Sequence, residues 1–455
     1  MDYTSIAAEQ RAQMLETIGV GSVDELFSTA PEPTRITSDL DLPAGASELE
    51  LQRELAELAS RNRATDQLHC FAGAGAYDHF IPAFIDQLIS RGEFLTAYTP
   101  YQGEASQGSL QSFFEFQTQV TRLTGLDISN ASLYEGASAT AEAVLLALHT
   151  NDQRRVLVAG TLHPDYRRVL RTVLDDLPVE IVEIEPDADG RIGVDAIAAA
   201  TTDDTACLIV QSPSFTGLIE DWEALFGALK TKAPKALAIA VFNPLACALL
   251  KSPGACGADV AAGEGQPLGI PLQLGGPYLG LFAARKQFLR KMPGRLVGQT
   301  TDADGRRAFC LALQTREQHI RGKKATSNVC TNQGLLALRA TMYMTAMGPQ
   351  GLREVAEQSW HKAHHLAKRI ADLPGYALKH DAAFFNEFVV TCPKPAQQVI
   401  DHAKSHGVLA GVALSSPRVG SIGSENGLLI AVTEKRSRED LDLLLTALQD
   451  AGERA

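Results

Sequence analysis

The fold is decided between residues 156 and 263, where five short apolar runs recur. These runs are VLVAG (156–160), VEIVEI (179–184), ACLIV (206–210), ALAIAVF (236–242) and ADVAAG (258–263). Helical patterns, such as those at 164–175 and 221–232, separate several of them. Short, continuous apolar strands that alternate with helices are typical of a mostly parallel sheet covered on both faces. The sequence therefore predicts an α/β fold.

Outside this region the sequence predicts an N-terminal arm and a smaller C-terminal domain. The arm contains an amphipathic stretch, a loop rich in Pro, Thr and Ser, and a helix that begins with a capping box. The C-terminal part begins with a long helical pattern and continues with the strand-like runs FFNEFVV (384–390) and GLLIAV (427–432). We expect an arm and helix at 1–63, a large α/β domain with a mostly parallel sheet at 64–334, and a small α+β domain at 335–455.

Composition disfavours several classes of protein. The 455 residues carry 41 Lys and Arg against 54 Asp and Glu, a net charge of −13, which disfavours binding to the phosphate backbone of nucleic acids. No segment approaches the run of about 18 apolar residues that a membrane span needs, and the N-terminus lacks the features of a secretory signal. The seven cysteines are scattered singly, which indicates reduced thiols and a cytoplasmic protein. His361, His364 and His365 have no carboxylate-rich or cysteine partner, so we expect no metal site.

A loop of small residues and several polar turns follow the predicted strands. The loop opens a helix, where free N–H groups and the helix dipole favour a phosphate, although such loops more often reflect close packing. Its candidate residues are Gly136, Ala137, Ser138 and Thr140. Later strands end in turns that contain His163, Gln211, Asn243 and Gln266, at the edge where open α/β sheets bind ligands. This order resembles the large domain of fold-type I pyridoxal-phosphate-dependent transferases.

Longer motifs narrow the resemblance to one family. They are FAGAGAYDH (71–79), YTPYQGEASQG (98–108), NASLYEG (130–136), LQTREQHIR (313–321) and ATSNVCT (325–331). Together they resemble the glycine cleavage system P-protein, glycine dehydrogenase (decarboxylating), and the resemblance spans essentially the whole chain. The chain has about half the length of the family's single-chain form. Its MLETIGVGSVDELF segment (14–27) resembles subunit 1, the alpha subunit of the split bacterial form.

The sequence departs from the family at two positions that the cofactor's chemistry needs. A pyridoxal enzyme needs a Lys amine to bond the cofactor, yet no Lys lies between Lys251 and Lys286, and Gln266 falls on that position. Asn243 falls on or beside the Asp that pairs with the pyridine nitrogen, and an amide cannot stabilise a pyridinium as a carboxylate does.

These departures imply a division of labour between two chains. The resemblance implies a catalytically incomplete alpha subunit that pairs with a Lys-bearing beta subunit, as α2β2, with pyridoxal phosphate held covalently by the beta subunit and not by this chain. The remnant cofactor pocket around Gly136, His163, Asn243 and Gln266 is then structural, and weak phosphate binding by its loop stays open.

Three further groups of residues are candidates for a cleft shared with the beta subunit. The first is a turn shaped by Pro and Gly, of the kind that often carries sites; its candidates are Tyr98, Thr99, Tyr101, Gln102, Ser106 and Gln107. The second is His79, for which capping or packing is at least as good an explanation. The third comprises Arg316, His319 and Arg321, for which a solvated or salt-bridged segment is the default.

The resemblance also implies an activity for the complex of two chains. With its beta subunit, the chain would bind glycine, release the carboxyl group as carbon dioxide, and pass the aminomethyl group to the lipoyl arm of the H-protein. Two alternatives stay open. The chain could be a non-catalytic scaffold that stabilises the beta subunit or docks the H-protein. It could instead be an independent pyridoxal enzyme that uses Lys323 or Lys324, although neither follows the expected strand.

Overall fold

The computed structural model describes residues 5–36, 38, 40–273, 275–330, 333–420 and 423–453. Thr331, the last residue of the ATSNVCT motif, lies outside these ranges. The chain divides into two compact units, residues 1–63 and 64–455. No helix in the described ranges has the length and apolar character that crossing a membrane requires.

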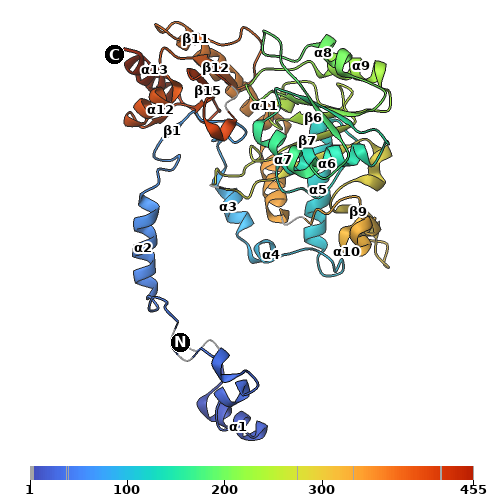
Figure 1. The fold of residues 1–455 in the computed structure, drawn as a ribbon, viewed down its shortest axis with the longest axis vertical. Helices are drawn as coiled ribbons and strands as arrows, with labels where there is room; N and C mark the ends of the chain where they lie inside the picture. The colour runs from blue at the N-terminus through green and yellow to red at the C-terminus, as the bar shows by residue number, and fades with distance from the viewer. Residues whose placement is uncertain are drawn as a thin grey trace. The chain divides into compact units, whose positions relative to one another are not determined.

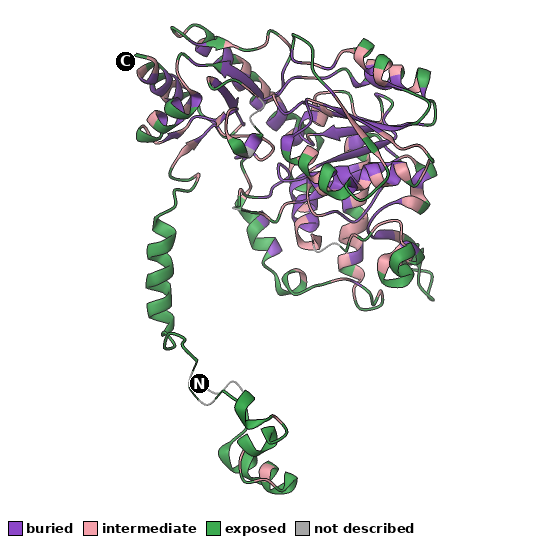
Figure 2. Ribbon diagram, viewed as in Figure 1, coloured by how far each residue is buried: buried purple, intermediate pink, exposed green. Residues whose placement is uncertain are grey.

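The described residues of the first unit contain two α-helices (Figure 1) and, between them, two short 3₁₀ helices at Asp24–Phe27 and Glu32–Thr34. Helix α1 spans Ala8–Ile18 and α2 spans Glu48–Ser60. The predicted capping box begins α2, because the Ser47 N–H donates to the Glu50 carboxylate at 2.8 Å and the Glu50 N–H donates to Ser47 Oγ at 3.4 Å. Neither helix has a buried residue, and Figure 2 shows both helices as exposed.

A seven-stranded sheet forms the centre of the second unit, with the order β2-β8-β7-β6-β5-β3-β4. Its strands are β2 (Ile128–Ser129), β3 (Arg155–Ala159), β4 (Glu180–Ile184), β5 (Thr205–Ser212), β6 (Leu237–Phe242), β7 (Val260–Glu264) and β8 (Gly280–Ala284). All neighbours from β4 to β7 pair in parallel, whereas β8 runs antiparallel to β7 and β2. The five apolar runs of the sequence are β3 to β7, so the predicted α/β fold is confirmed.

Helices cover both faces of this sheet because alternate strand residues face opposite sides. Leu157, Leu208 and Ala238 join one core with residues of α5 (Gln107–Thr124), α9 (Trp222–Lys232) and α11 (Gly334–Ala371). Their neighbours Val156, Cys207 and Leu237 join a second core with residues of α6 (Gly136–Leu148) and α7 (Pro164–Leu174). Figure 2 shows the strands between them as buried. The other α-helices in the described residues of this part of the chain are α3 (Ala83–Ile89), α4 (Gly92–Leu95), α8 (Val194–Ala200) and α10 (Gln318–Arg321).

A second, antiparallel sheet with its own core lies toward the C-terminus. Its order is β11-β12-β15-β14, formed by Ala377–Leu378, Glu387–Thr391, Gly427–Ala431 and Val412–Ala413. Helices α12 (Ala396–Ser405) and α13 (Arg438–Glu453) contribute to the core beside it. Helix α11 connects the two regions. It kinks at Gly348 but stays in the large core as far as Ala356, and from Ala363 onward it packs in the C-terminal core.

Two small strand pairs complete the second unit. Strand β1 (His69–Cys70) pairs in parallel with β13 (Val408–Leu409), and β9 (Leu296–Thr301) pairs with β10 (Arg307–Ala312). The β1–β13 pair ties the beginning of the predicted large domain to the C-terminal region. The boundary at 334/335 stays a prediction.

Candidate functional site

The remnant-pocket candidates gather at the carboxyl edge of the parallel strands. His163 follows β3, Asn243 follows β6, Gln266 follows β7, and Gly136 begins α6. His163 and Asn243 line one pocket together with Glu264. Open α/β sheets bind their ligands at this edge. The structure therefore brings these predicted residues into one region.

Two backbone N–H groups at the start of α6 already donate hydrogen bonds to carboxylates of this chain. The N–H of Ser138 donates to both oxygens of Glu135, at 3.0 and 3.1 Å, and the N–H of Gly136 donates to Glu264 at 3.0 Å. Ala137 is buried, and the Thr140 hydroxyl donates to the Gly136 carbonyl at 2.8 Å. A phosphate approaching this turn would meet two carboxyl groups in place of these two N–H groups.

The carboxyl group of Glu264, a half-buried residue, lies at the centre of this arrangement. Burial raises its pKa to about 7, although hydrogen bonds from the N–H groups of Gly136, Leu279 and Gln266 lower it. Space is also short, because a Cβ at Gly136 would lie 1.9 Å from the hydroxyl oxygen of Tyr166. The loop is thus closed by the chain's own side chains.

Both polar atoms of the Gln266 side chain are hydrogen-bonded to the backbone. Its Oε1 accepts from the Tyr77 N–H at 2.8 Å, and its Nε2 donates to the carbonyls of Tyr77 at 2.9 Å and Ile270 at 2.8 Å. The residue is 1% exposed. Gln266 therefore clamps the FAGAGAYDH segment to the end of β7. Asn243 has a local role as well, since its Oδ1 accepts from the Leu245 N–H at 2.9 Å.

The FAGAGAYDH segment lies against the remaining polar groups of the pocket. The Ala74 N–H donates to Glu387 at 2.7 Å, and the Tyr77 hydroxyl donates to the other Glu387 oxygen at 2.9 Å. Glycine is needed at position 75, where φ is +103° and a Cβ would lie 2.9 Å from Nε2 of His163. Burial raises the pKa of Glu387 to about 7.

His163 is held in one neutral tautomer by its neighbours. Its Nδ1 accepts from the Asp165 N–H at 3.1 Å, which leaves Nε2 to donate to the Ala74 carbonyl at 2.9 Å. Burial lowers its pKa, and its ring stacks on Tyr166 with centroids 4.8 Å apart. Among the residues that the structure describes, the pocket offers no Lys amine, no acidic partner at Asn243 and no free N–H at Gly136 or Ser138. The residues present do not fit pyridoxal phosphate.

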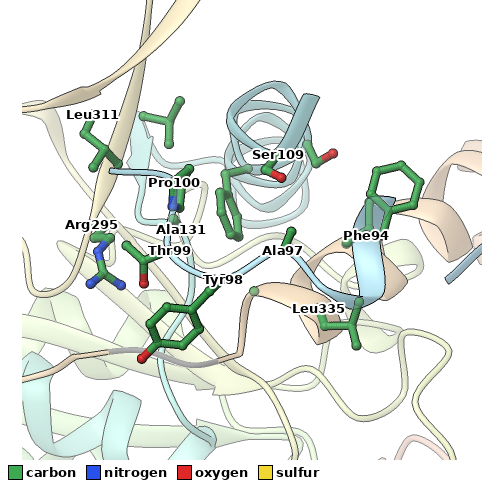
Figure 3. A pocket seen from close by; sticks show the side chains of 15 residues that line it. Phe94, Ala97, Tyr98, Thr99, Pro100, Ser109, Ala131, Arg295, Leu311 and Leu335 are labelled. Carbon is green, nitrogen blue, oxygen red and sulfur yellow. The ribbon is translucent and has the colours of Figure 1, made fainter. Parts of the chain in front are cut away.

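The loop predicted at 98–107 borders a different pocket, shown in Figure 3. Tyr98 and Thr99 line it, together with Phe94 and the side chain of Arg295. The side chain of Tyr98 is 73% exposed. The loop therefore presents aromatic surface to its surroundings.

Arg295 links this loop to the LQTREQHIR segment. Its Nη2 donates to the Tyr101 hydroxyl at 3.0 Å, and its guanidinium lies 5.4 Å from the centre of the Tyr101 ring. Its Nε lies 3.6 Å from Glu317, and Nδ1 of His319 lies 3.6 Å from the same carboxylate oxygen. The rings of Tyr101 and His319 meet edge to face at 5.6 Å. The structure thus joins two predicted groups through Arg295.

Other residues of the loop have supporting positions. Gln107 pairs with the backbone of Phe309, accepting from its N–H at 2.8 Å and donating to its carbonyl at 2.9 Å. Ser106 is the N-cap residue of α5, and its N–H donates to the Gln102 carbonyl at 3.1 Å. Gln102 itself is exposed, and Thr99 is half-buried.

The remaining candidates are spread over separate surroundings. Arg316 is buried and donates to the carbonyls of Met292 and Gly294, the latter at 3.2 Å, while Arg321 is exposed. Burial lowers the pKa of Arg316. His79 is buried, with its Nδ1 2.7 Å from the carboxylate of Glu434.

Lys323 and Lys324 lie in the exposed turn Gly322–Lys324 and line none of the pockets described here.

Three important residues were missed in the sequence. Arg295 directly precedes strand β9, and Glu264 and Glu387 are single carboxylates at strand positions. Only the polar ending of the apolar ADVAAG run at Glu264 gives a local signal, because a strand end at this edge is a place for functional groups.

Comparison with known proteins gives a family for this chain. The family model described as "Glycine cleavage system P-protein" matches residues 1–448. The chain belongs to the glycine cleavage system P-protein family. A relative from Thermomicrobium roseum, named "Probable glycine dehydrogenase (decarboxylating) subunit 1", is 47% identical over 454 residues, which cover 99% of this chain and 100% of that protein. A protein of the same name from Chlorobium chlorochromatii is 46% identical, covering 98% of this chain and 99% of the relative.

Solved structures agree with membership of the P-protein family. A crystal structure described as "glycine decarboxylase (P-protein) of the glycine cleavage system, in inhibitor-bound form" superposes with a TM-score of 0.90 at 41% identity, covering 99% of this chain and 100% of the other. A sphingosine-1-phosphate lyase from Burkholderia pseudomallei superposes with a TM-score of 0.66 at 14% identity, covering 94% and 95% of the two chains. The second match shows the fold alone, which is that of fold-type I pyridoxal-phosphate enzymes.

Proposed function

We propose that this chain is the alpha subunit of a two-chain glycine dehydrogenase (decarboxylating). The relatives named subunit 1 match it over essentially their whole length, and a numbered subunit implies a partner chain. In the proposed reaction the complex takes glycine, releases the carboxyl group as carbon dioxide, and passes the aminomethyl group to the lipoyl arm of the H-protein. We further propose an α2β2 assembly that works in the cytoplasm.

The bonding of Gln266 is the observation that carries the division of labour. All three hydrogen bonds of its side chain join it to other residues of this chain, and the resemblance to the family aligns it with the cofactor Lys. An amide nitrogen is not a nucleophile, so it cannot bond the cofactor covalently. This supports a beta subunit that holds pyridoxal phosphate, which when bound there supplies the electron sink for decarboxylation.

This chain's own contribution is the wall formed by the loop 98–107. Arg295 fixes Tyr101 through a hydrogen bond of 3.0 Å and places its positive charge beneath the ring. A side chain that is held before substrate arrives needs no further ordering, which favours catalysis. We propose that Tyr98 and Tyr101 face the cleft shared with the beta subunit, and that Arg295 is a positioning residue for Tyr101.

A scaffold without a catalytic contribution is the second candidate function. It is favoured by the remnant pocket, whose buried groups at Gln266 and Glu387 are satisfied within the chain. The two functions differ in what the loop does. A scaffold would tolerate changes at Tyr98 and Tyr101 that leave assembly intact.

One experiment tests the main proposal. The chain is produced alone and together with its beta subunit, incubated with pyridoxal phosphate, reduced with borohydride, and mapped by peptide mass spectrometry, while release of labelled carbon dioxide from glycine is followed in parallel. We expect the label on a beta-subunit Lys and activity only in the pair. A stoichiometric adduct on a Lys of this chain, with decarboxylation by the chain alone, would overturn the proposal.

A further inference from the structure

Helices α12 and α13 bring together three side chains that ordinarily bind metal ions. The two helices lie side by side in the C-terminal region (Figure 1). His402 lies in the last turn of α12, His406 is the residue that ends it, and Asp450 lies in the last turn of α13. One imidazole nitrogen from each histidine and one carboxylate oxygen all lie within 4.8 Å of one another.

The spacing of the two histidines suits a shared ligand. Residues four apart lie on the same face of a helix, one turn above the other. The ring centroids of His402 and His406 are 5.1 Å apart, and Nε2 of His406 lies 3.7 Å from Asp450. Two ligands of a tetrahedral zinc ion are separated by about 3.3 Å, given zinc–nitrogen bonds of about 2.0 Å. Small rotations of these partly exposed side chains would close the set around an ion.

His402 provides an independent indication of a missing partner. Its Nε2 is buried and has no hydrogen-bond partner within the described part of the chain. A buried polar atom without a partner costs about 1–3 kcal/mol. A metal ion would satisfy this nitrogen, and a neutral imidazole needs no other change to serve as a ligand.

The helix ends favour a positive ion at this place. The C-terminal end of a helix carries a partial negative charge from its unpaired carbonyls. Both α12 and α13 end here, since His406 follows Ser405 and Asp450 lies three residues before Glu453. Nearby lysines are otherwise engaged: Lys404 pairs with Asp401 at 2.8 Å, and Lys394 donates to the Ala451 carbonyl at 3.0 Å.

We propose that His402, His406 and Asp450 form a binding site for a divalent transition-metal ion, with zinc as the expected occupant. Two imidazoles and one carboxylate are a donor set that zinc accepts, and solvent would fill the fourth position. None of the three residues lines the remnant pocket or the pocket in Figure 3. The ion is therefore assigned a structural role, in which it joins the ends of α12 and α13. The site does not depend on the proposed enzymatic function.

Zinc titration of the complex tests this site. The full chain is co-purified with its beta subunit without an affinity tag, stripped of metal, and titrated calorimetrically with Zn²⁺, beside a His402→Ala/His406→Ala variant. We expect the wild-type complex to bind one more equivalent per alpha chain than the variant, and Asp450→Asn to weaken that equivalent by at least about tenfold, as loss of a metal-supporting group does. Cobalt added in place of zinc should give visible ligand-field absorption only when both histidines are present.

Matched controls separate this site from other metal binding. His361→Ala/His365→Ala removes another pair of histidines four apart, and within the described residues that pair belongs to no group of three metal-binding side chains. This control should keep the extra equivalent. His402→Gln/His406→Gln retains polar side chains should the alanine variant fail to fold. Equal zinc stoichiometry and affinity in wild type and both histidine variants, or no zinc binding by the wild type, would overturn the proposal.

Discussion

The side chains of the remnant pocket and those of the loop at 98–107 differ in their exposure to solvent and in their hydrogen bonding. In the pocket, Gln266 and Glu387 are buried and Glu264 is half-buried, and each is bonded to the chain's own backbone. In the loop, residue Tyr98 is 73% exposed and residue Tyr101 is 53% exposed. Buried groups that bond one another stabilise a fold, whereas groups fixed at a surface can act on another molecule. The comparison assigns stability to the pocket and function to the loop.

The largest expected effect comes from restoring an amine in the pocket. Gln266→Lys leaves the Tyr77 N–H without its acceptor and places an ammonium at a position that is 1% exposed. We expect the free energy of unfolding to fall by about 3–5 kcal/mol, measured by urea denaturation at fixed protein concentration. Gln397→Lys, on an exposed position of α12, is the matched control and should change stability by less than about 0.5 kcal/mol.

The same variant also tests whether the pocket is closed to the cofactor. Borohydride reduction with pyridoxal phosphate should give no specific adduct at residue 266. If Gln266→Lys stayed as stable as wild type and captured the cofactor stoichiometrically, the pocket would be a dormant site and the comparison would fail.

The second prediction concerns pH and Glu387. Burial raises its folded-state pKa from 4.5 to about 7, so the folded chain holds a proton that the unfolded chain releases. This contribution to stability is complete below pH 4.5 and is lost as pH rises toward 7. Glu387→Gln stays neutral and can keep its bonds to Ala74 and Tyr77. The variant should match wild type near pH 4.5 and exceed it by about 3 kcal/mol at pH 8.

Unfolding curves at both pH values check this linkage. Glu453→Gln, an exposed carboxyl group at the end of α13, serves as the control and should show little change with pH relative to wild type. If Glu387→Gln lowered the free energy of unfolding equally at pH 4.5 and pH 8, the contribution of Glu387 would come from its packing and hydrogen bonds. Its protonation would then not affect stability.

The third prediction addresses Arg295 and the loop. Arg295→Lys keeps the positive charge but loses the planar guanidinium that both bonds the hydroxyl of Tyr101 and lies under its ring. We expect kcat of the complex to fall about tenfold, equivalent to about 1.4 kcal/mol, with the complex still assembled in sedimentation. Because a positioning role acts through Tyr101, the Arg295→Lys/Tyr101→Phe double variant should be little worse than Arg295→Lys alone. If the losses in kcat of the two single variants multiply in the double variant, Arg295 and Tyr101 act independently and the positioning role is wrong.

The sequence predicted the large sheet well and the side-chain bonding poorly, for a physical reason. Strands β3 to β7 are buried on both faces, so each is a continuous apolar run that a single segment reveals. Strand β8 was missed, because GLFAA lies among glycines and its antiparallel place depends on partners distant in the chain. The clamp between Gln266 and Tyr77 joins residues 189 positions apart, so neither local sequence contains it. The role of Arg295 likewise depends on its contacts with Tyr101 and Glu317, which the sequence around Arg295 does not reveal.

The smallest expected effect, that of Tyr98→Phe on turnover, distinguishes best between a catalytic loop and a scaffold. The change removes a single oxygen from an exposed residue that lines the pocket in Figure 3. A residue that is 73% exposed contributes little to the folded chain, so the free energy of unfolding should change by less than about 0.5 kcal/mol. If the hydroxyl donates or accepts a hydrogen bond in the shared cleft, its loss costs about 1 kcal/mol, or about fivefold in turnover. Tyr134→Phe is the matched control, since that hydroxyl bonds the backbone of Cys330 within the chain. Glycine decarboxylation by the assembled complex should fall for Tyr98→Phe at unchanged stability. Unchanged turnover in Tyr98→Phe and in Tyr101→Phe would return the loop to a structural role and favour the scaffold, because a wall that touches no substrate has no use for either hydroxyl.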